Sequence, residues 1–147
     1  MAEINGGYRS RRIKFRAWDK EKNEFFEPTY RAYEGALEDL YVCLDGDLGM
    51  RTLLESAIHE SVFPDRFILQ QWSGLTDKNG VEIYEGDFYK NPLGNNMKII
   101  FDMRESAFVG ESLRTGEKFH LLNFNGSLNG EVIGNIYEHS HLLEAKQ

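Results

Sequence analysis

The stretch QWSGLTDKNGVEIYEGD, residues 71–87, is denser in turn-forming and buried-type residues than any other part of the chain. It contains three glycines and several large apolar side chains within seventeen residues. Gly80 closes the tetrapeptide Asp-Lys-Asn-Gly, which is typical of a tight turn because glycine adopts a positive φ without steric cost. The stretch therefore predicts a junction between an N-terminal half and a C-terminal all-β half.

Upstream of this junction, apolar and other residues alternate. Residues 13, 15 and 17 are Ile13, Phe15 and Ala17, and they alternate with Lys14, Arg16 and Trp18. A period of two predicts a half-buried strand. A polar turn follows, and residues 24–27 can return as a second strand before Pro28, which lacks the N–H that a sheet ladder needs. We therefore expect a β-hairpin over residues 13–27.

The next segment carries helical spacing. Residues 40–44 fit either a helix or a short buried strand, and the pattern leaves both open. Beyond them, apolar residues recur three and four positions apart, at Met50, Leu53, Leu54, Ala57 and Ile58. This spacing is typical of an amphipathic helix that packs on a core, and Pro64 disfavours helical geometry in the residue before it. The sequence predicts one short helix over residues 50–61.

Short β-type runs separated by Asn, Gly and Pro fill the C-terminal half. They cover residues 87–90, 97–103, 107–111, 119–124 and 131–137. Strands at this spacing are typical of a small barrel or roll rather than a sandwich. We expect a mainly β (α+β) fold, with a last helical turn at residues 142–145.

The charge of the chain is uneven. The net charge is −7, yet residues 9–16 hold five cations. Outside residues 1–16, 12 lysines and arginines face 23 aspartates and glutamates, a net charge of −11. An acidic body repels phosphate, which disfavours nucleic-acid binding. The basic strip suits an anionic partner or the acidic surface of a second subunit, and the plain alternative is a solvated charged edge.

The sequence also indicates a compartment. No apolar run approaches the roughly 20 residues that span a membrane, and the N-terminus lacks the charged-then-apolar order of a signal peptide. The single cysteine, Cys43, cannot form an internal disulfide. We therefore expect a cytoplasmic protein without membrane contact.

Aromatic and charged residues provide the candidate binding surface. An aromatic side chain between cations on one strand face suits recognition of a protein or of nucleic acid. Trp18 equally suits the covering of a neighbouring lobe. The candidate binding residues are Arg12, Lys14, Arg16, Trp18, Trp72, Tyr84 and Asp87.

Catalysis has little support in the sequence. Cys43 lies in an apolar run, where a thiol is inert rather than activated. Glu82, Glu85 and Asp87 crowd one segment, but carboxylates beside glycine brace turns as readily as they perform acid–base chemistry. We expect no catalytic residues.

Metal binding has little support either. Asp45-Gly46-Asp47 resembles the opening of a calcium loop but lacks the later ligands. His59 and His120 are isolated in the sequence, and the pair His139 and His141 has no further Cys or His beside it. Zinc needs three or four converging ligands. We expect no metal and no cofactor.

Three motifs stand in order along the chain: KFRAWD at residues 14–19, GLTDKNGVEIYEGD at residues 74–87 and VIGNIYE at residues 132–138. Together they resemble the YopX family of phage and prophage proteins. The resemblance implies a protein encoded by a phage or prophage, of unestablished biochemical role. It also implies that the C-terminal part is similar to a small SH3-like β-barrel of about five strands.

Domain boundaries and a function follow as expectations. We expect a flexible tail at residues 1–12, a β/α lobe at 13–73, the SH3-like barrel at 74–140 and a C-terminal tail at 141–147. The expected function is a non-enzymatic accessory protein of the bacterial host cytoplasm that binds host or phage proteins and forms a homo-oligomer. The alternatives are a nucleic-acid binder that uses the barrel and the basic strip, and an enzyme that uses the carboxylates at 82–87.

Overall fold

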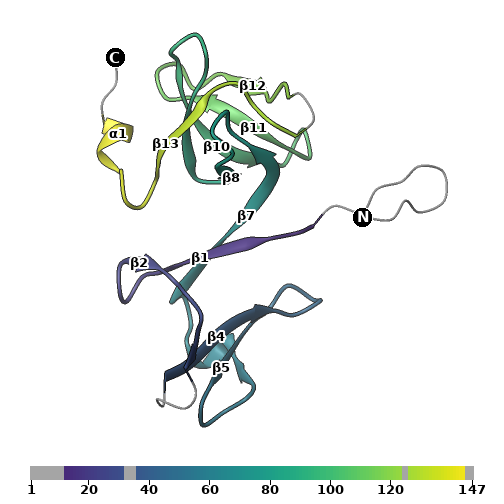
Figure 1. The fold of residues 1–147 in the computed structure, drawn as a ribbon, viewed down its shortest axis with the longest axis vertical. Coiled ribbons are helices and arrows are strands. Elements are labelled where there is room, and N and C mark those ends of the chain that lie inside the picture. Colours follow the sequence, from purple (N-terminus) through teal and green to yellow (C-terminus); the bar gives the residue numbers. More distant parts are fainter. Residues whose placement is uncertain (1–11, 32–35, 124–125, 145–147) are drawn as a thin grey trace, which may run out of the picture. The chain divides into compact units, whose positions relative to one another are not determined.

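The computed structural model describes residues 12–31, 36–123 and 126–144, and strands dominate it (Figure 1). The chain forms two compact units. The terminal unit comprises Met1–Arg16 and Gln70–Gln147, and the central unit comprises Ala17–Leu69. Among the described residues, helix is confined to the 3-10 turn η2 (Glu60–Val62) and to α1 (His141–Glu144). The expectation of a mainly β fold is confirmed.

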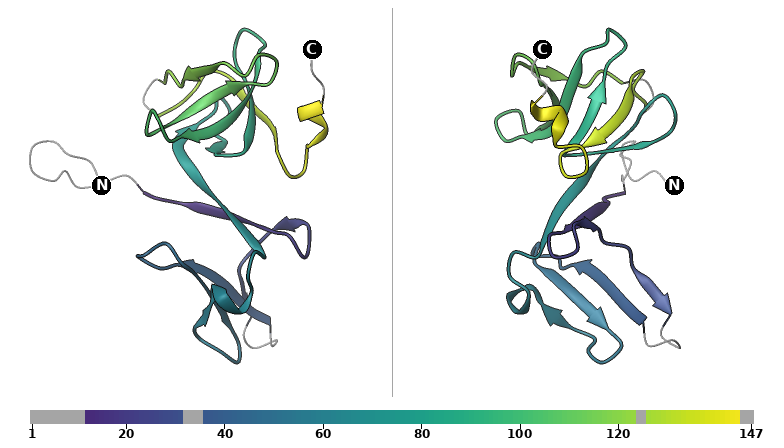
Figure 2. Two further views of the ribbon diagram at one scale, coloured as in Figure 1. Left: turned by 180° about the vertical axis from the view of Figure 1, so that it is seen from behind. Right: turned by 90° about the vertical axis from the view of Figure 1, so that its left-hand side faces the viewer.

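A five-stranded antiparallel sheet forms the body of the terminal unit, and it curls into a half-barrel (Figure 2). Its strand order is β12-β11-β10-β9-β13. The strands are β9 (Asp87–Lys90), β10 (Asn96–Asp102), β11 (Ala107–Ser112), β12 (Lys118–His120) and β13 (Glu131–Asn135). Each overlaps one of the β-type runs of the C-terminal half.

The core of the terminal unit lies on the inner face of this sheet. Met97 and Ile99 alternate with more exposed neighbours along β10, so one face of the strand is apolar. They pack with Ile83, Tyr89 and Leu128, and Ile83 and Ile99 are fully buried. Burying one such side chain stabilises the fold by about 1.5–3 kcal/mol.

The stretch at residues 71–87, called the signature stretch from here on, contains the turn between β7 (Phe67–Thr76) and β8 (Glu82–Tyr84), and Asp77 organises that turn. Asp77 Oδ1 accepts the N–H groups of Asn79 and Val81, and Oδ2 accepts the N–H of Val132 in β13. One buried carboxylate therefore closes the turn and ties it to the half-barrel. Gly80 takes a φ of +81° with open space around it, as the turn motif predicts.

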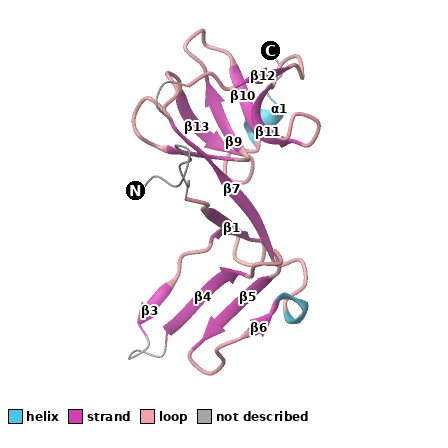
Figure 3. Cartoon of the chain, turned by 90° about the vertical axis from the view of Figure 1, so that its right-hand side faces the viewer, coloured by secondary structure: helices cyan, strands magenta, loops and turns pink. Residues whose placement is uncertain are grey.

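The central unit contains a four-stranded antiparallel sheet in the order β3-β4-β5-β6 (Figure 3). Its strands are β3 (Thr29–Arg31), β4 (Ala36–Val42), β5 (Leu48–Thr52) and β6 (Ile58–His59). Ala17, Leu48 and Phe67 form the buried core, and the rings of Phe26 and Phe63 meet Phe67 edge-on. The segment that fitted either a helix or a strand is largely β4.

The prediction of a helix over residues 50–61 is wrong. The end of β5 and the whole of β6 lie in this segment and pair with each other, and the short η2 turn follows β6. The helical stripe is not a buried face, since Leu53 and Leu54 are 49% and 91% exposed. Leu48 and Met50, two positions apart on β5, contribute to the core instead. Pairing of β5 with both β4 and β6 satisfies its backbone, and this tertiary pairing overrides the helical spacing.

The N-terminal hairpin is present, as predicted. β1 (Phe15–Asp19) and β2 (Glu24–Phe25) pair antiparallel, with Trp18 opposite Phe25. β1 also neighbours β7 in a sheet of order β2-β1-β7-β8. Within the described part of the chain, no helix has the length and apolar character needed to cross a membrane.

Candidate functional site

Lys14, which precedes β1, and Arg16 in β1 both form ion pairs within the terminal unit. The Lys14 ammonium pairs with the Glu82 carboxylate in β8 and lies 5.3 Å from the centroid of the Trp72 ring. Backbone pairing holds this arrangement, since the Trp72 N–H donates to the Lys14 carbonyl at 2.8 Å. Both charged side chains are about one-third exposed, so this pair remains open to solvent and salt.

Arg16 is held by a second, more buried set of contacts. Its Nη2 donates to Asp87 Oδ1 at 2.6 Å and its Nε donates to Gln70 Oε1 at 2.7 Å. Its guanidinium lies 4.8 Å from the centroid of the Tyr84 ring. The second Asp87 oxygen, Oδ2, accepts the Tyr84 N–H at 2.8 Å. Asp87 thus joins β1 to the turn that precedes β9.

Burial dominates the electrostatics of Asp87. Removal from water raises the pKa of this carboxyl above its ordinary value, and the positive charge of Arg16 and the Tyr84 N–H oppose that rise. Burial also raises the pKa of the Tyr84 hydroxyl, with the Glu82 charge acting in the same direction. Each Asp87 oxygen already has a donor from the chain, and this arrangement suits a structural brace.

The structure brings together five of the seven candidate binding residues, all in the terminal unit: Lys14, Arg16, Trp72, Tyr84 and Asp87. Trp18 belongs to the central unit and is only 7% exposed, with its ring 5.0 Å from that of Phe25. Trp18 therefore covers its own unit, and the alternative of an exposed Trp18 is wrong. Arg12 is exposed. Arg9 and Arg11, the other cations of the basic strip, lie outside the described residues.

An apolar groove of about 450 Å³ lies between the β9–β10 turn and β12. Leu93 in the turn is 86% exposed, Leu122 after β12 is 84% exposed and Phe119 in β12 is 44% exposed. The groove is defined here by Tyr89, Leu93, Met97, Phe119, Leu122 and Leu128. Sequence reasoning missed it, although a leucine inside the polar turn NPLGNN was a usable signal.

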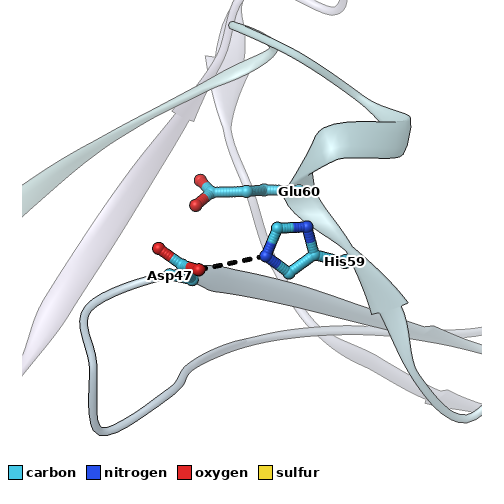
Figure 4. A group of neighbouring side chains, drawn as sticks. All are labelled: Asp47, His59 and Glu60. Carbon is cyan, nitrogen blue, oxygen red and sulfur yellow. Dashed lines mark hydrogen bonds and ion pairs between the residues drawn. The ribbon is translucent and has the colours of Figure 1, made fainter.

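One group of three metal-ligand side chains occurs among the described residues: Asp47, His59 and Glu60 (Figure 4). His59 Nε2 lies 3.0 Å from Asp47 Oδ2. This hydrogen bond raises the pKa of His59 and lowers the pKa of Asp47 from their ordinary values. Sequence reasoning missed the group because a helix was expected over residues 50–61, whereas β5–β6 pairing sets His59 opposite Gly49.

The pair His139 and His141 stands near the C-terminus, with ring centroids 6.2 Å apart. His139 Nδ1 accepts the Asn135 N–H, and Glu138 accepts a hydrogen bond from the Asn135 amide. These residues cap the end of β13 within the chain.

A family model described as YopX protein matches residues 14–144. The chain belongs to the YopX family. Protein EF1440 from Enterococcus faecalis has a similar crystal structure, with 23% identity, a TM-score of 0.54 and coverage of 91% of this chain and 99% of that one. Protein yopX from Bacillus subtilis is similar at 17% identity and a TM-score of 0.53, over 90% of this chain and 97% of that one. These two similarities show that the chain has the same fold as both proteins. A comparison with curated proteins found no match.

Proposed function

We propose that this YopX-family protein is a non-enzymatic module that binds proteins and associates with a second copy of itself through the apolar groove. The exposed leucines of the groove carry the proposal. Contiguous apolar surface is unfavourable in water and marks interaction sites in soluble proteins. Covering Leu93 and Leu122, which are 86% and 84% exposed, gains about 1.5–3 kcal/mol for each side chain.

The position of the groove favours a second copy as its occupant. β12 is the end strand of the five-stranded sheet and contributes Phe119 to the groove. An end strand offers backbone groups to another strand. If β12 pairs antiparallel with β12 of a second copy, the two copies are related by a two-fold axis, and the groove of each lies at the same interface. Lys118 in β12 is already neutralised by Asp102 at 3.1 Å, so two copies meet there with reduced repulsion.

The remaining expectations belong to the same proposal. The curled sheet, its short strands and the family motifs support a small SH3-like barrel and a phage or prophage accessory role in the host cytoplasm. Nucleic-acid binding has less support, because Lys14 and Arg16 are paired with carboxylates of their own unit and Trp18 is buried. An enzyme that uses the carboxylates at 82–87 also has less support, because Arg16 and the Tyr84 N–H occupy Asp87.

Light scattering coupled to size exclusion tests the proposal on the full chain at micromolar concentration. We expect a dimer mass for the unmodified protein and a monomer mass for the double variant Leu93→Asp, Leu122→Asp. Leu54→Asp is the matched control, since Leu54 is 91% exposed but does not line the groove, and this variant should remain dimeric. A monomeric unmodified protein, or a double variant that stays dimeric, contradicts the proposal.

A further inference from the structure

The side chains of Asp47, His59 and Glu60 converge from two adjoining segments of the central unit (Figure 4). Asp47 stands immediately before β5, His59 ends β6 and Glu60 begins η2. The β5–β6 ladder pairs Gly49 with His59 and Met50 with Ile58. Backbone pairing therefore fixes the approach of the carboxylate that precedes β5 to the imidazole that ends β6.

Gly49 also allows β5 to pair with β4 on the side away from β6. It pairs with Tyr41 of β4, and a Cβ at position 49 would overlap the Tyr41 ring. Because β5 is in register between β4 and β6, His59 lies on a braced sheet, and Asp47 closes the β4–β5 turn, where its carbonyl accepts the Cys43 N–H. Ligands on rigid elements keep their geometry when an ion binds.

The spacing of the three ligand atoms suits a single cation. One atom from each side chain lies within 4.8 Å of the other two. Ligands at about 2.1 Å from a metal, with an angle of 90–109° between them, stand about 3.0–3.4 Å apart. His59 Nε2 and Asp47 Oδ2 already have this separation, at 3.0 Å. The Glu60 carboxylate offers the third ligand atom, within 4.8 Å of the other two.

Ser61 contacts the ring nitrogen of His59 that does not face Asp47. Its Oγ lies 2.9 Å from His59 Nδ1, and its N–H donates to the same nitrogen at 3.1 Å. When an ion takes Nε2, the ring proton moves to Nδ1 and Ser61 Oγ accepts it. The Ser61 N–H then loses its acceptor, and this cost keeps the affinity moderate.

The surroundings leave room for further ligands. His59, Glu60 and Ser61 also line a cavity of about 260 Å³. Water molecules there can fill the positions that three protein ligands leave open. An imidazole beside two carboxylates favours a divalent first-row transition ion over Ca²⁺ or Mg²⁺, which prefer ligand sets made of oxygen alone.

We propose that Asp47, His59 and Glu60 form a binding site for a divalent transition ion such as Zn²⁺ on the central unit. The site is independent of the apolar groove, which belongs to the terminal unit. Nothing in the proposal requires self-association, so either proposal can fail without the other.

Titration of the full chain with Zn²⁺ at neutral pH, followed by calorimetry and by amide chemical shifts, tests the site. We expect one saturable Zn²⁺ per chain, with shift changes centred on residues 47 and 59–61. His59→Gln, Asp47→Asn and Glu60→Gln should each weaken binding by more than about tenfold, since loss of even an outer-shell partner costs about 10–100-fold. Mg²⁺ should not compete at equal concentration.

Two further variants separate this site from the other histidines. His120→Gln and His141→Gln remove equivalent imidazoles elsewhere, and both should retain Zn²⁺ affinity within about twofold. His59 is exposed, so His59→Gln should keep the fold, and its amide spectrum checks that directly. Absence of saturable binding, unchanged affinity in His59→Gln, or loss of binding in His141→Gln instead would overturn the proposal.

Discussion

Two carboxylates beside turns of the terminal unit and two in the central unit have opposite surroundings. In the terminal unit, Asp77 and Asp87 are each 2% exposed, and their oxygens are filled by backbone N–H groups and by Arg16. In the central unit, Asp47 and Glu60 are only partly buried and converge on His59. A carboxylate whose oxygens accept hydrogen bonds from the chain stabilises the fold. A carboxylate that lies beside other metal-ligand side chains can still bind an external ion.

The strongest test of this contrast is the removal of the Asp77 carboxylate. Asp77→Ala removes a carboxylate that is 2% exposed and leaves three N–H groups, in partly buried hydrogen bonds, without their acceptor. Each unsatisfied group costs about 1–3 kcal/mol. We expect a loss of about 3–5 kcal/mol in the free energy of unfolding, which urea denaturation measures.

Asp45→Ala is the matched control for that loss. Asp45 also accepts a backbone N–H two residues ahead, that of Asp47, but this contact is exposed to water. Water replaces the lost acceptor, so the free energy of unfolding should fall by less than about 1 kcal/mol. Equal losses in the two variants would mean that burial of Asp77 does not determine its role.

The next contrast lies within the terminal unit, between two ion pairs formed by residues two positions apart. Arg16→Met leaves Asp87 buried and without its cation, and we expect a loss of about 2–4 kcal/mol. Lys14→Met breaks the pair with Glu82, in which both side chains are about one-third exposed, and should cost about 0–1 kcal/mol. Double-mutant cycles with Asp87→Asn and Glu82→Gln measure the two coupling energies. A larger coupling for Lys14 with Glu82 would contradict this order.

These residues also show how far the sequence predicts the fold. The turn around Gly80 and the hairpin at β1 and β2 follow from local chemistry, so local patterns predicted them. The partner of Asp87 did not follow, because Arg16 lies 71 positions away and only tertiary pairing brings them together. Alternation placed Lys14, Arg16 and Trp18 on one face, yet Trp18 packs in the central unit and the cations pair in the terminal unit.

Non-local pairing also explains what the sequence missed in the central unit. The apolar positions from Met50 to Ile58 satisfy a helical period by coincidence, while strand pairing of β5 with two neighbours determines the outcome. Once the helix was expected, His59 could not be placed beside Asp47. The groove was missed for a related reason, since Leu93 and Leu122 are far apart in sequence and line one groove only in the folded unit.

Two glycines of the signature stretch provide a smaller contrast. Gly80 and Gly86 have similar φ values, +81° and +86°, but a Cβ at position 80 meets open space, whereas one at position 86 overlaps the Gln70 side chain. Gln70 is 3% exposed and bonded to Arg16, so it cannot move aside freely. Gly80→Ala should cost about 1 kcal/mol for its backbone conformation. Gly86→Ala should cost about 1 kcal/mol more, and thermal unfolding of both variants measures the difference. Equal costs would mean that Gln70 gives way.

The smallest expected effect is a pair of opposite pKa shifts, at Asp19 in the central unit and at Asp87 in the terminal unit. It tests whether the immediate neighbours of a carboxylate, rather than the unit it belongs to, determine its pKa. Asp19 is a buried carboxylate of the central unit, and Arg66 donates to both of its oxygens, at 3.1 and 2.9 Å. These hydrogen bonds from Arg66 hold the pKa of Asp19 below its ordinary value of 3.8, against the effect of burial. Asp87 accepts a hydrogen bond from Arg16 Nη2 on one oxygen, and burial raises its pKa above the same value.

The two shifts predict opposite dependences of stability on pH. The folded state of Asp19 binds its proton less tightly than the unfolded state, so its contribution is full above the ordinary pKa and is lost as pH falls through the lower, folded pKa. The folded state of Asp87 binds its proton more tightly, so its contribution declines as pH rises from the ordinary pKa through the higher, folded pKa. Carboxyl ¹³C chemical shifts followed against pH should show Asp19 titrating below 3.8 and Asp87 above it. Titration of both groups on the same side of 3.8 would contradict the prediction that the Arg66 hydrogen bonds outweigh burial at Asp19 while burial dominates at Asp87.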